Sequence, residues 1–191
     1  RRTMDLVTIS ENVLRDCLRA KAGEEVLIVT DDTRVSIAQA LYEGAKNLGC
    51  EAMMTVMKER KLNGEEPPKA VAEAMKAADI VICPTAKSLT HTNARIQAVA
   101  AGTRVATMPG ITEEMFSQGA MTADYSAVAE LTAKITEMLT ECQTARIEKD
   151  GCVLTLNLEG RKGVPSPGVY REAGQSGNLP SGEAYIAPLE D

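Results

Sequence analysis

Short apolar runs alternate with segments of helical periodicity through most of the chain. Short apolar runs typical of buried parallel strands occupy residues 25–30 and 79–83, and residues 51–57 and 103–107 are also predicted as strands. Apolar positions at three- and four-residue steps predict helices over 6–18, 36–48, 68–77, 93–101, 112–117 and 125–142. This alternation predicts an α/β fold, an open doubly wound and mostly parallel sheet with helices on both faces.

The pattern changes after residue 142. Two short runs flank Asp150-Gly151, a strong tight-turn signal, and predict a β-hairpin over 145–158. Residues 160–188 are rich in Gly, Pro and Ser and keep no helical period. We therefore expect an α/β amino-terminal domain over 1–142, followed over 143–191 by the start of a β-rich second domain that is incomplete in this sequence.

In a doubly wound sheet, ligands bind in the crevice outside the carboxyl ends of the strands. Three loops are predicted there, at residues 31–34, 84–92 and 108–112. Asp31, Asp32 and Arg34 follow the first strand and are candidates for the rim of a pocket. The alternative that we favour is structural: the carboxylates cap the following helix and Arg34 pairs across the turn.

The second loop contains His91, the only histidine of the chain. It lies just before a predicted helix that Asn93 is placed to cap, and a helix N-terminus attracts anionic or carbonyl-bearing ligands. A neutral imidazole there is able to donate a hydrogen bond or to carry a proton near neutral pH. The competing interpretation is a partly exposed loop histidine with local contacts.

Other features of these loops are interpreted as structural. Thr112 is a plausible helix cap with Glu113 and Glu114 in the first turn, and Phe116 is expected to pack. The phosphate-binding patterns GxGxxG and GxxxxGK[ST] are absent from the sequence. Nucleotide binding therefore has no support beyond the fold class.

Composition narrows the function classes further. The net charge of −6 and the pI near 5.0 argue against nucleic acid or an anionic membrane as partner. No apolar run is long enough to cross a bilayer, and no signal peptide is apparent. The five cysteines form no CxxC pair, so most are expected to be buried free thiols in a reducing cytoplasm.

The most specific segment is residues 177–188, which holds Asn178-Leu179-Pro180-Ser181-Gly182-Glu183. Glu183 follows a rigid Pro/Gly turn and precedes a short apolar strand, a setting that is expected to restrict its rotamers and its contact with solvent. A carboxylate oriented in this way suits a divalent metal or a general acid–base role.

This segment closely resembles the Asn-Leu-Pro-x-Gly-Glu segment of the M29 aminopeptidase family and of its relatives, the 2,5-dihydroxypyridine 5,6-dioxygenases. The aminopeptidase branch implies that Glu183 is a ligand in a two-metal site (Zn, Co or Mn). The dioxygenase branch implies one Fe(II) held by two histidines and a carboxylate. In that branch His91, with Thr90 beside it, resembles a loop histidine that contacts the ring substrate. Family members tend to be dimers, which implies a homo-oligomer.

The chain departs from both branches, because one histidine cannot complete either metal site. We expect it to be the amino-terminal part of a longer enzyme, inactive by itself. The first hypothesis is a metal-dependent aminopeptidase-like hydrolase acting on peptides. The second is an Fe(II)-dependent dioxygenase that opens a small hydroxylated pyridine-type ring. The third is a non-catalytic α/β binding or assembly module.

Overall fold

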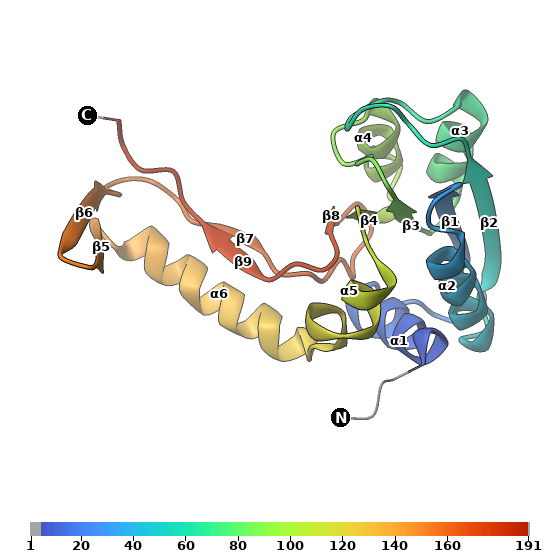
Figure 1. Cartoon of the computed structure of the whole chain (residues 1–191), viewed down its shortest axis with the longest axis horizontal. Coiled ribbons are helices and arrows are strands. Elements are labelled where there is room, and N and C mark those ends of the chain that lie inside the picture. The colour runs from blue at the N-terminus through green and yellow to red at the C-terminus, as the bar shows by residue number, and fades with distance from the viewer. Residues whose placement is uncertain (1–4, 191) are drawn as a thin grey trace. The chain divides into compact units, whose positions relative to one another are not determined.

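A parallel β-sheet organises the first of two units in the computed structural model of the chain, which describes residues 5–190. This unit comprises the chain up to Asp124 together with Gly168–Pro180 (Figure 1). Its strands are β1 (Glu25–Asp31), β2 (Glu51–Met57), β3 (Ile80–Thr85), β4 (Arg104–Pro109) and β8 (Ser176–Asn178). Its helices are α1 (Leu6–Asn12) with the π-helical turn η1 (Val13–Cys17), α2 (Val35–Asn47), α3 (Lys69–Ala77), α4 (Asn93–Ala100), α5 (Glu113–Ser117) and the 3₁₀ turn η2 (Gly119–Thr122).

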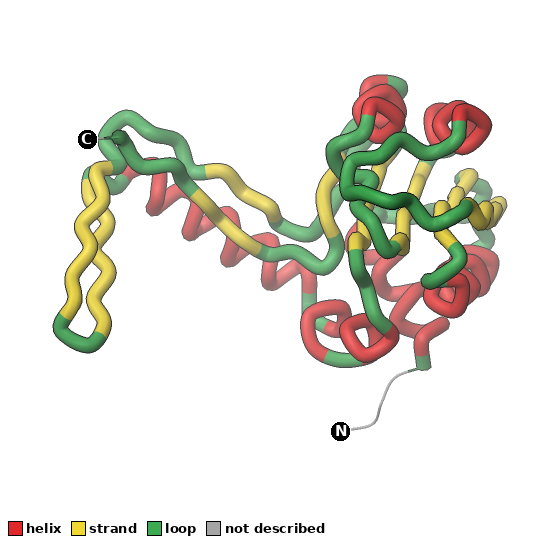
Figure 2. The backbone as a smooth tube through the Cα atoms, turned by 45° about the horizontal axis from the view of Figure 1, so that its top comes forward, coloured by secondary structure: helices red, strands yellow, loops and turns green. Residues whose placement is uncertain are grey.

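The strand order β2-β1-β3-β4-β8, with every neighbouring pair parallel, confirms the predicted doubly wound α/β sheet. Helices lie on both faces of the sheet (Figure 2). On one face α1 packs against α2 and α5, and on the other α3 packs against α4. The chain order reverses between β1 and β3, so the crevice expected of such sheets lies at the carboxyl ends of these strands.

Alternating side chains of the strands build two cores, one under each helical layer. Leu27, Val29 and Val81 pack with Met75 and Ala98 in the core under α3 and α4. Phe116 is fully buried in the first unit, as predicted. Strands β1, β3 and β4 are almost wholly buried because helices cover them on both faces, which explains their continuous apolar runs. The edge strand β2 is partly exposed.

The fifth strand, β8, differs from the prediction. Its three residues, Ser-Gly-Asn, carry no apolar pattern, so the sequence places them in an irregular segment. The backbone instead pairs with β4, with Val105 opposite Ser176 and Thr107 opposite Asn178. Backbone hydrogen bonds along an open sheet edge need no particular side chain, and the strand therefore escapes pattern-based prediction.

β3 also departs from the prediction, since Pro84 lies inside the strand rather than ending it. Its neighbour β4 is paired with β3 through Met108 and Pro109. A proline lacks the N–H donor but keeps its carbonyl, and the Pro84 carbonyl accepts a hydrogen bond from the Thr30 hydroxyl at 2.8 Å.

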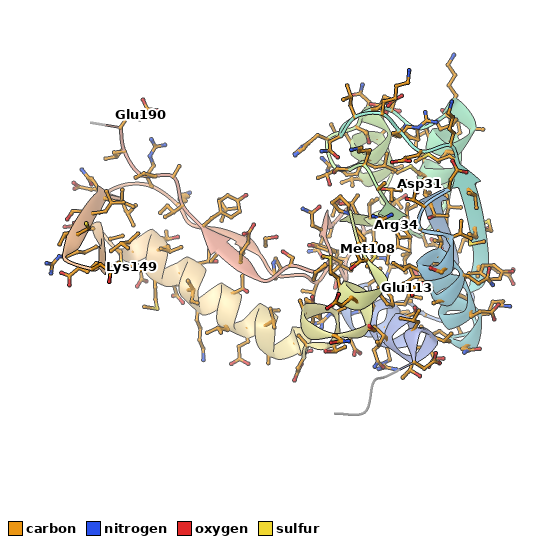
Figure 3. The ribbon with its side chains drawn as sticks, in the orientation of Figure 1. Asp31, Arg34, Met108, Glu113, Lys149 and Glu190 are labelled. Atoms are coloured by element: carbon orange, nitrogen blue, oxygen red, sulfur yellow. The ribbon has the colours of Figure 1, made fainter. Side chains whose placement is uncertain are left out.

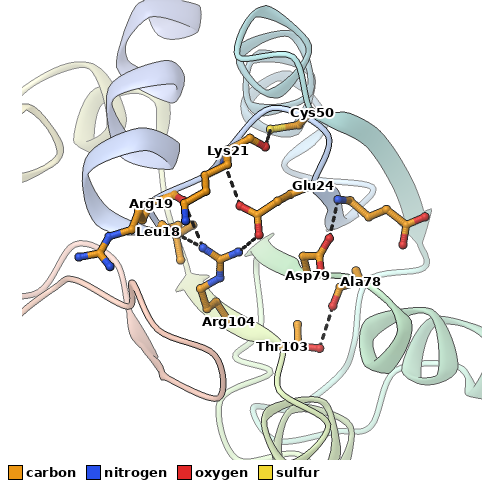
Figure 4. A network of polar contacts seen from close by, with 10 residues as sticks. Leu18, Arg19, Lys21, Glu24, Cys50, Ala78, Asp79, Thr103 and Arg104 are labelled. Atoms are coloured by element: carbon orange, nitrogen blue, oxygen red, sulfur yellow. Dashed lines mark hydrogen bonds and ion pairs between the residues drawn. The ribbon is translucent and has the colours of Figure 1, made fainter.

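At the amino edge of the sheet, Arg104 contacts Leu18, Arg19 and Glu24, which lie 80 to 86 residues earlier in the sequence (Figure 4). Its guanidinium donates to the carbonyl oxygens of Leu18 (2.7 Å) and Arg19 (3.2 Å), where the first helical segment ends. The same group forms an ion pair with the Glu24 carboxylate, which also accepts from the Lys21 N–H at 2.9 Å. Arg104 is 7% exposed, so this polar network is part of the interior.

The second unit comprises Tyr125–Pro167 and the chain from Ser181 onward. It contains α6 (Tyr125–Glu141), the hairpin β5 (Thr144–Lys149) and β6 (Cys152–Asn157), and the antiparallel pair β7 (Val164–Ser166) and β9 (Glu183–Tyr185), which packs on α6. The predicted hairpin is confirmed. Its turn places Asp150 and Gly151 at φ +50° and +80°, the left-handed region that Asp-Gly tolerates.

These units differ in two respects from the expected division at residue 142. The long helix α6 groups with the β-segments that follow it, and residues 168–180 return to the first unit. The expected β-rich character of the later residues is present in the antiparallel pairs β5–β6 and β7–β9. No helix among residues 5–190 has both the length and the apolar character to span a membrane.

All five cysteines are free: Cys17, Cys50 and Cys83 are buried, whereas Cys142 and Cys152 are exposed. Burial raises the pKa of the Cys17 and Cys83 thiols to about 12 and also raises that of Cys50. Because the thiolate is the reactive form, a thiol reagent at pH 8 is expected to label the two exposed cysteines first and the other three only in urea. Mass spectrometry of the labelled chain provides the measurement.

Because these pKa values are raised in the folded chain, the stability of the fold depends on pH. Keeping the buried thiols neutral contributes stability that is present below pH about 9 and is lost as the pH rises toward 12. Rapid labelling of Cys83 in the native chain at pH 8 would contradict this account of the core.

Candidate functional site

The three loops predicted at the carboxyl edge of the sheet do come together. Asp31, at the end of β1, is 1% exposed and links the first loop to the second. Its Oδ1 accepts from the Thr33 N–H (2.9 Å) and hydroxyl (2.6 Å), and its Oδ2 accepts from the Ala86 N–H at 2.7 Å. Asp31 therefore fixes both loops where the strand order reverses.

The predicted capping role of the two carboxylates is wrong. The N-cap residue of α2 is Arg34, and no side chain caps this helix. Asp31 is already satisfied by Thr33 and Ala86, while the exposed Asp32 accepts from the Glu59 N–H at 3.2 Å. The expected pairing of Arg34 across the turn is replaced by hydrogen bonds to the Thr33 hydroxyl (2.9 Å) and to the backbone carbonyl of Ile111.

Arg34 connects the first loop to the third and lines a shallow pocket of about 220 Å³. Ile111, Thr112 and Glu113 also line it. Arg34 and Glu113 are labelled in Figure 3. Thr112 caps α5 as predicted, since its hydroxyl accepts from the Met115 N–H at 3.1 Å. The pocket holds both a guanidinium and the Glu113 carboxylate, and the carboxylate accepts from the Ser36 hydroxyl at 2.6 Å. Arg34 is thus a rim residue of this pocket, while Asp31 and Asp32 are not among its lining residues.

A separate polar cluster lies at the carboxyl edge of the sheet, on residues from the ends of β3, β4 and β8. The hydroxyls of Thr90 and Thr107 lie 2.8 Å apart. Both contact the Asn178 Oδ1, at 3.1 Å and 2.7 Å. The Ser88 hydroxyl donates to Thr90 at 2.8 Å and extends the chain of hydroxyls. Thr107 is 1% exposed, whereas the Asn178 side chain reaches solvent.

The position of Asn178 follows from its backbone. The Tyr170 hydroxyl donates to the Asn178 carbonyl at 2.6 Å, and the Leu179 N–H donates to the Thr107 carbonyl at 2.9 Å. A Cβ at Gly177 would lie 2.3 Å from the Tyr170 hydroxyl oxygen, so the tyrosine requires glycine there. The Gly-Asn-Leu sequence therefore fixes one amide side chain at the carboxyl edge.

The orientation of the Asn178 amide is set by its partners. Because Oδ1 accepts from two threonines, Nδ2 is the part of the amide that points away from the cluster. No described residue accepts a hydrogen bond from this Nδ2. Asn178 can therefore offer two N–H donors to an anionic or carbonyl oxygen of a ligand.

His91 lies in the second loop, one residue after Thr90, and is exposed. Its imidazole makes no hydrogen bond to residues 5–190. The helix that follows is capped by Thr92, whose hydroxyl accepts from the Arg95 N–H at 3.2 Å, and not by Asn93 as predicted. Its first N–H groups are occupied as well.

A carboxylate from a distant loop binds the free backbone N–H groups at the N-terminus of α4. The side chain of Glu66 accepts from the backbone N–H groups of Asn93 and Ala94, the latter at 3.1 Å. The expected anion site at this helix is therefore taken by the protein itself. His91 remains available to a ligand as a side chain, without help from the field of a free helix end.

Glu183 lies in the second unit, as the first residue of β9, opposite Ser166 of β7. Its side chain is exposed and forms no hydrogen bond with the part of the chain that the structure describes. The expected restriction of its solvent contact is thus wrong for this chain, and the expected restriction of its rotamers stays a prediction. The turn before it is tight, because a Cβ at Gly182 would lie 2.6 Å from a methyl carbon of Val128.

The residues present do not fit either metal site implied by the resemblance. Within residues 5–190, no three His, Cys, Asp or Glu side chains gather in a way that could hold a metal ion. The whole sequence has one histidine, and a two-histidine, one-carboxylate site needs two. Glu183 remains a single candidate ligand.

Sequence reasoning identified Thr90 and His91 but missed Thr107 and Asn178 as members of the site. The signal for Asn178 was present, because it opens the Asn-Leu-Pro-x-Gly-Glu segment. The signal for Thr107 was its position as the last predicted residue of a strand, where polar side chains of parallel sheets meet.

Comparison with known proteins gives a family match over nearly the whole chain. The NicX family model, described as 2,5-dihydroxypyridine 5,6-dioxygenase, matches residues 5–191. No curated protein gives a significant match.

Two solved structures share the fold. A 2,5-dihydroxypyridine dioxygenase from Pseudomonas putida KT2440 is 18% identical with a TM-score of 0.70, covering 97% of this chain and 56% of that one. AmpT from Thermus thermophilus is 17% identical with a TM-score of 0.61, covering 96% of this chain and 61% of that one. The chain thus spans little more than half the length of either protein.

At these identities the two structures establish the α/β fold, and the resemblance read from residues 177–188 is confirmed at the level of the family. Because the family model extends over residues 5–191, this chain belongs to the NicX family of 2,5-dihydroxypyridine 5,6-dioxygenases.

Proposed function

We propose that this chain forms the amino-terminal, substrate-contacting part of an Fe(II)-dependent dioxygenase that opens a hydroxylated pyridine-type ring. The observation that carries the proposal is the family match over residues 5–191. Iron, when bound, supplies the activation of O₂ and of the ring. This chain contributes at most Glu183 as a ligand, so the other ligands come from residues outside this sequence.

Within this proposal, the Asn178 amide binds an oxygen of the substrate. A hydroxypyridine presents hydroxyl or oxyanion groups, and the Asn178 Nδ2 is a donor whose direction is fixed by Thr90 and Thr107. Binding to a preset donor avoids the cost of reorienting the amide when the substrate arrives. Asn178 is thus a specificity residue for an oxygen-bearing ring.

His91 has the complementary role. The exposed imidazole of His91 is able to accept a proton from a substrate hydroxyl and to return it. Its position directly after Thr90 places it on the loop whose hydroxyl orients Asn178. We assign His91 the transfer of a proton of the substrate hydroxyl.

The second candidate is a metal-dependent aminopeptidase-like hydrolase, which has Zn, Co or Mn in place of iron and a peptide as substrate. The similarity to AmpT and the Glu183 segment favour it. A hydrolase has no comparable use for His91, and the family match supports the dioxygenase. We therefore rank the dioxygenase first. A non-catalytic module is the remaining hypothesis. The five free thiols support a reducing cytoplasm as the compartment for any of the three.

Asn178→Leu is expected to lower kcat/KM for 2,5-dihydroxypyridine by about 10- to 100-fold, because a hydrogen bond to a charged oxygen contributes about 1.5–3 kcal/mol. The measurement is O₂ uptake with Fe(II), using the longest natural polypeptide that carries these residues.

The matched control is Asn47→Leu, the same substitution at the C-terminal end of α2, where the side chain donates to Glu11 at 2.7 Å. This variant is expected to keep the wild-type rate. Equal rates for Asn178→Leu and Asn47→Leu would remove Asn178 from the substrate site.

A further inference from the structure

Helix α6 is apolar on two adjacent faces, and only one of them is covered. The inner face, which includes Val128, Thr132, Thr136 and Leu139, is buried or half-buried against the β7–β9 pair. The outer face exposes Leu131, Ile135 and Met138, which are 58%, 41% and 62% exposed, and it ends at the exposed Cys142 just after the helix.

These four outer residues follow the spacing of a coiled coil. The steps from Leu131 to Ile135, Met138 and Cys142 are four, three and four residues, as between alternating d and a positions of a heptad. An isolated surface leucine is ordinary, but an uninterrupted a/d stripe over three turns is the pattern of a helix that packs against another helix.

The charged residues beside the stripe favour an antiparallel second copy of α6 as the partner. Lys134 and Glu141 occupy the g positions, which flank the a/d seam. When two copies of α6 pack antiparallel, Leu131 meets Cys142 of the second copy and Ile135 meets Met138. Each Lys134 then faces the opposite-signed Glu141. A parallel pair would place Lys134 beside Leu139 and gain no ion pair.

We propose that the outer face of α6 binds the α6 helix of a second copy of this chain as an antiparallel helix pair. Lys134 is free to turn toward the second copy, because its pair with Glu130, at 3.6 Å, is highly exposed and contributes little. The seam covers about two heptads, which is short for a coiled coil, so association in the micromolar range is expected. This inference names a surface for the homo-oligomer and is independent of the reaction.

Sedimentation equilibrium of the chain under reducing conditions tests the proposal. The wild type is expected to be a dimer at tens of micromolar, and Ile135→Glu a monomer with unchanged circular dichroism. Ile147→Glu is the matched control, since Ile147 is 56% exposed on β5 in the same unit, and this variant stays dimeric. A monomeric wild type, or an Ile135→Glu variant that still dimerises, overturns the proposal.

Charge reversal tests the pairing itself. Lys134→Glu is expected to weaken the dimer several-fold, and the double variant Lys134→Glu with Glu141→Lys to restore it, because the two charges then exchange places across the seam. Failure of the double variant to recover would exclude the antiparallel arrangement.

Cross-linking tests the direction. In a Cys152→Ser background, Leu131→Cys is expected to form a disulfide with Cys142 of the second copy on mild oxidation, whereas Cys142 without Leu131→Cys forms none. A disulfide between the two Cys142 residues would show a parallel pair instead and overturn the proposal.

Discussion

Replacing Arg104 with leucine is expected to lower the free energy of unfolding by about 3 kcal/mol, because removing one partner of a buried ion pair strands the other. The Arg104 side chain is 9% exposed and that of its partner Glu24 is 22% exposed. The change also leaves the carbonyls of Leu18 and Arg19 without their donor at the end of the first helical segment. Leucine fills much of the volume and cannot replace any of these contacts.

The measurement is urea unfolding followed by circular dichroism. Arg15→Leu is the control, since Arg15 pairs with Asp16 at the surface, with side chains 52% and 49% exposed. The Arg15→Leu variant is expected to lose less than about 1 kcal/mol of unfolding free energy. Arg104→Lys should fall between the two variants, because an ammonium keeps the charge and loses the forked donor geometry. An Arg104→Leu variant as stable as Arg15→Leu would refute the structural role of this network.

Asp31→Ala is expected to cost about 2–4 kcal/mol of stability, since it removes the acceptor from two backbone N–H groups and one hydroxyl at a buried position. The same change should also loosen the loop that carries Thr90 and His91, because Asp31 holds that loop through the Ala86 N–H. We therefore expect a further loss of ring-opening activity in the full polypeptide, of about tenfold or more.

The neighbouring carboxylate supplies the control. Asp32→Ala removes an exposed side chain with a single bond of 3.2 Å to Glu59, and is expected to change stability by less than about 0.5 kcal/mol. Asp31→Asn should retain part of the network, because one amide oxygen still accepts. Comparable losses of stability for Asp31→Ala and Asp32→Ala would show that the hydrogen bonds of Asp31 to both loops are dispensable.

The sheet was predictable from the sequence because its first four strands carry their own signal. Residues 25–30 and 79–83 are apolar on both faces, and a strand buried between two helical layers requires that composition. Thr112 was predicted as a cap because its partner, Met115, lies three residues away, within the reach of a local rule.

The failures share a cause, which is contact between segments far apart in sequence. Asp31 looked like a cap, but its carboxylate binds Ala86, 55 residues away. The N-terminus of α4 looked free, but Glu66 fills it from 27 residues upstream. β8 has no apolar pattern and is held through its backbone by β4. Propensity and spacing depend on residues close in sequence, so they cannot identify partners that lie far along the chain.

The candidate site was found only in part for the same reason. Thr90 and His91 stood out through their loop and the resemblance of that loop to the dioxygenases. The role of Asn178 depends on Thr90 and Thr107, which reach it from 88 and 71 residues away. Glu183 differs from Asn178, because its sequence motif is specific. In this chain, however, its side chain is exposed to solvent and has no structural partner among the described residues.

The most direct test of the account is O₂ consumption by the longest natural polypeptide that carries these residues, purified without oxygen, loaded with Fe(II) and given 2,5-dihydroxypyridine. We predict stoichiometric loss of O₂ and of the ring absorbance, and no release of amino acids from peptide amides with Zn²⁺, Co²⁺ or Mn²⁺. Peptide hydrolysis without O₂ uptake would contradict the dioxygenase assignment and favour the hydrolase, and the absence of both activities would leave the non-catalytic module.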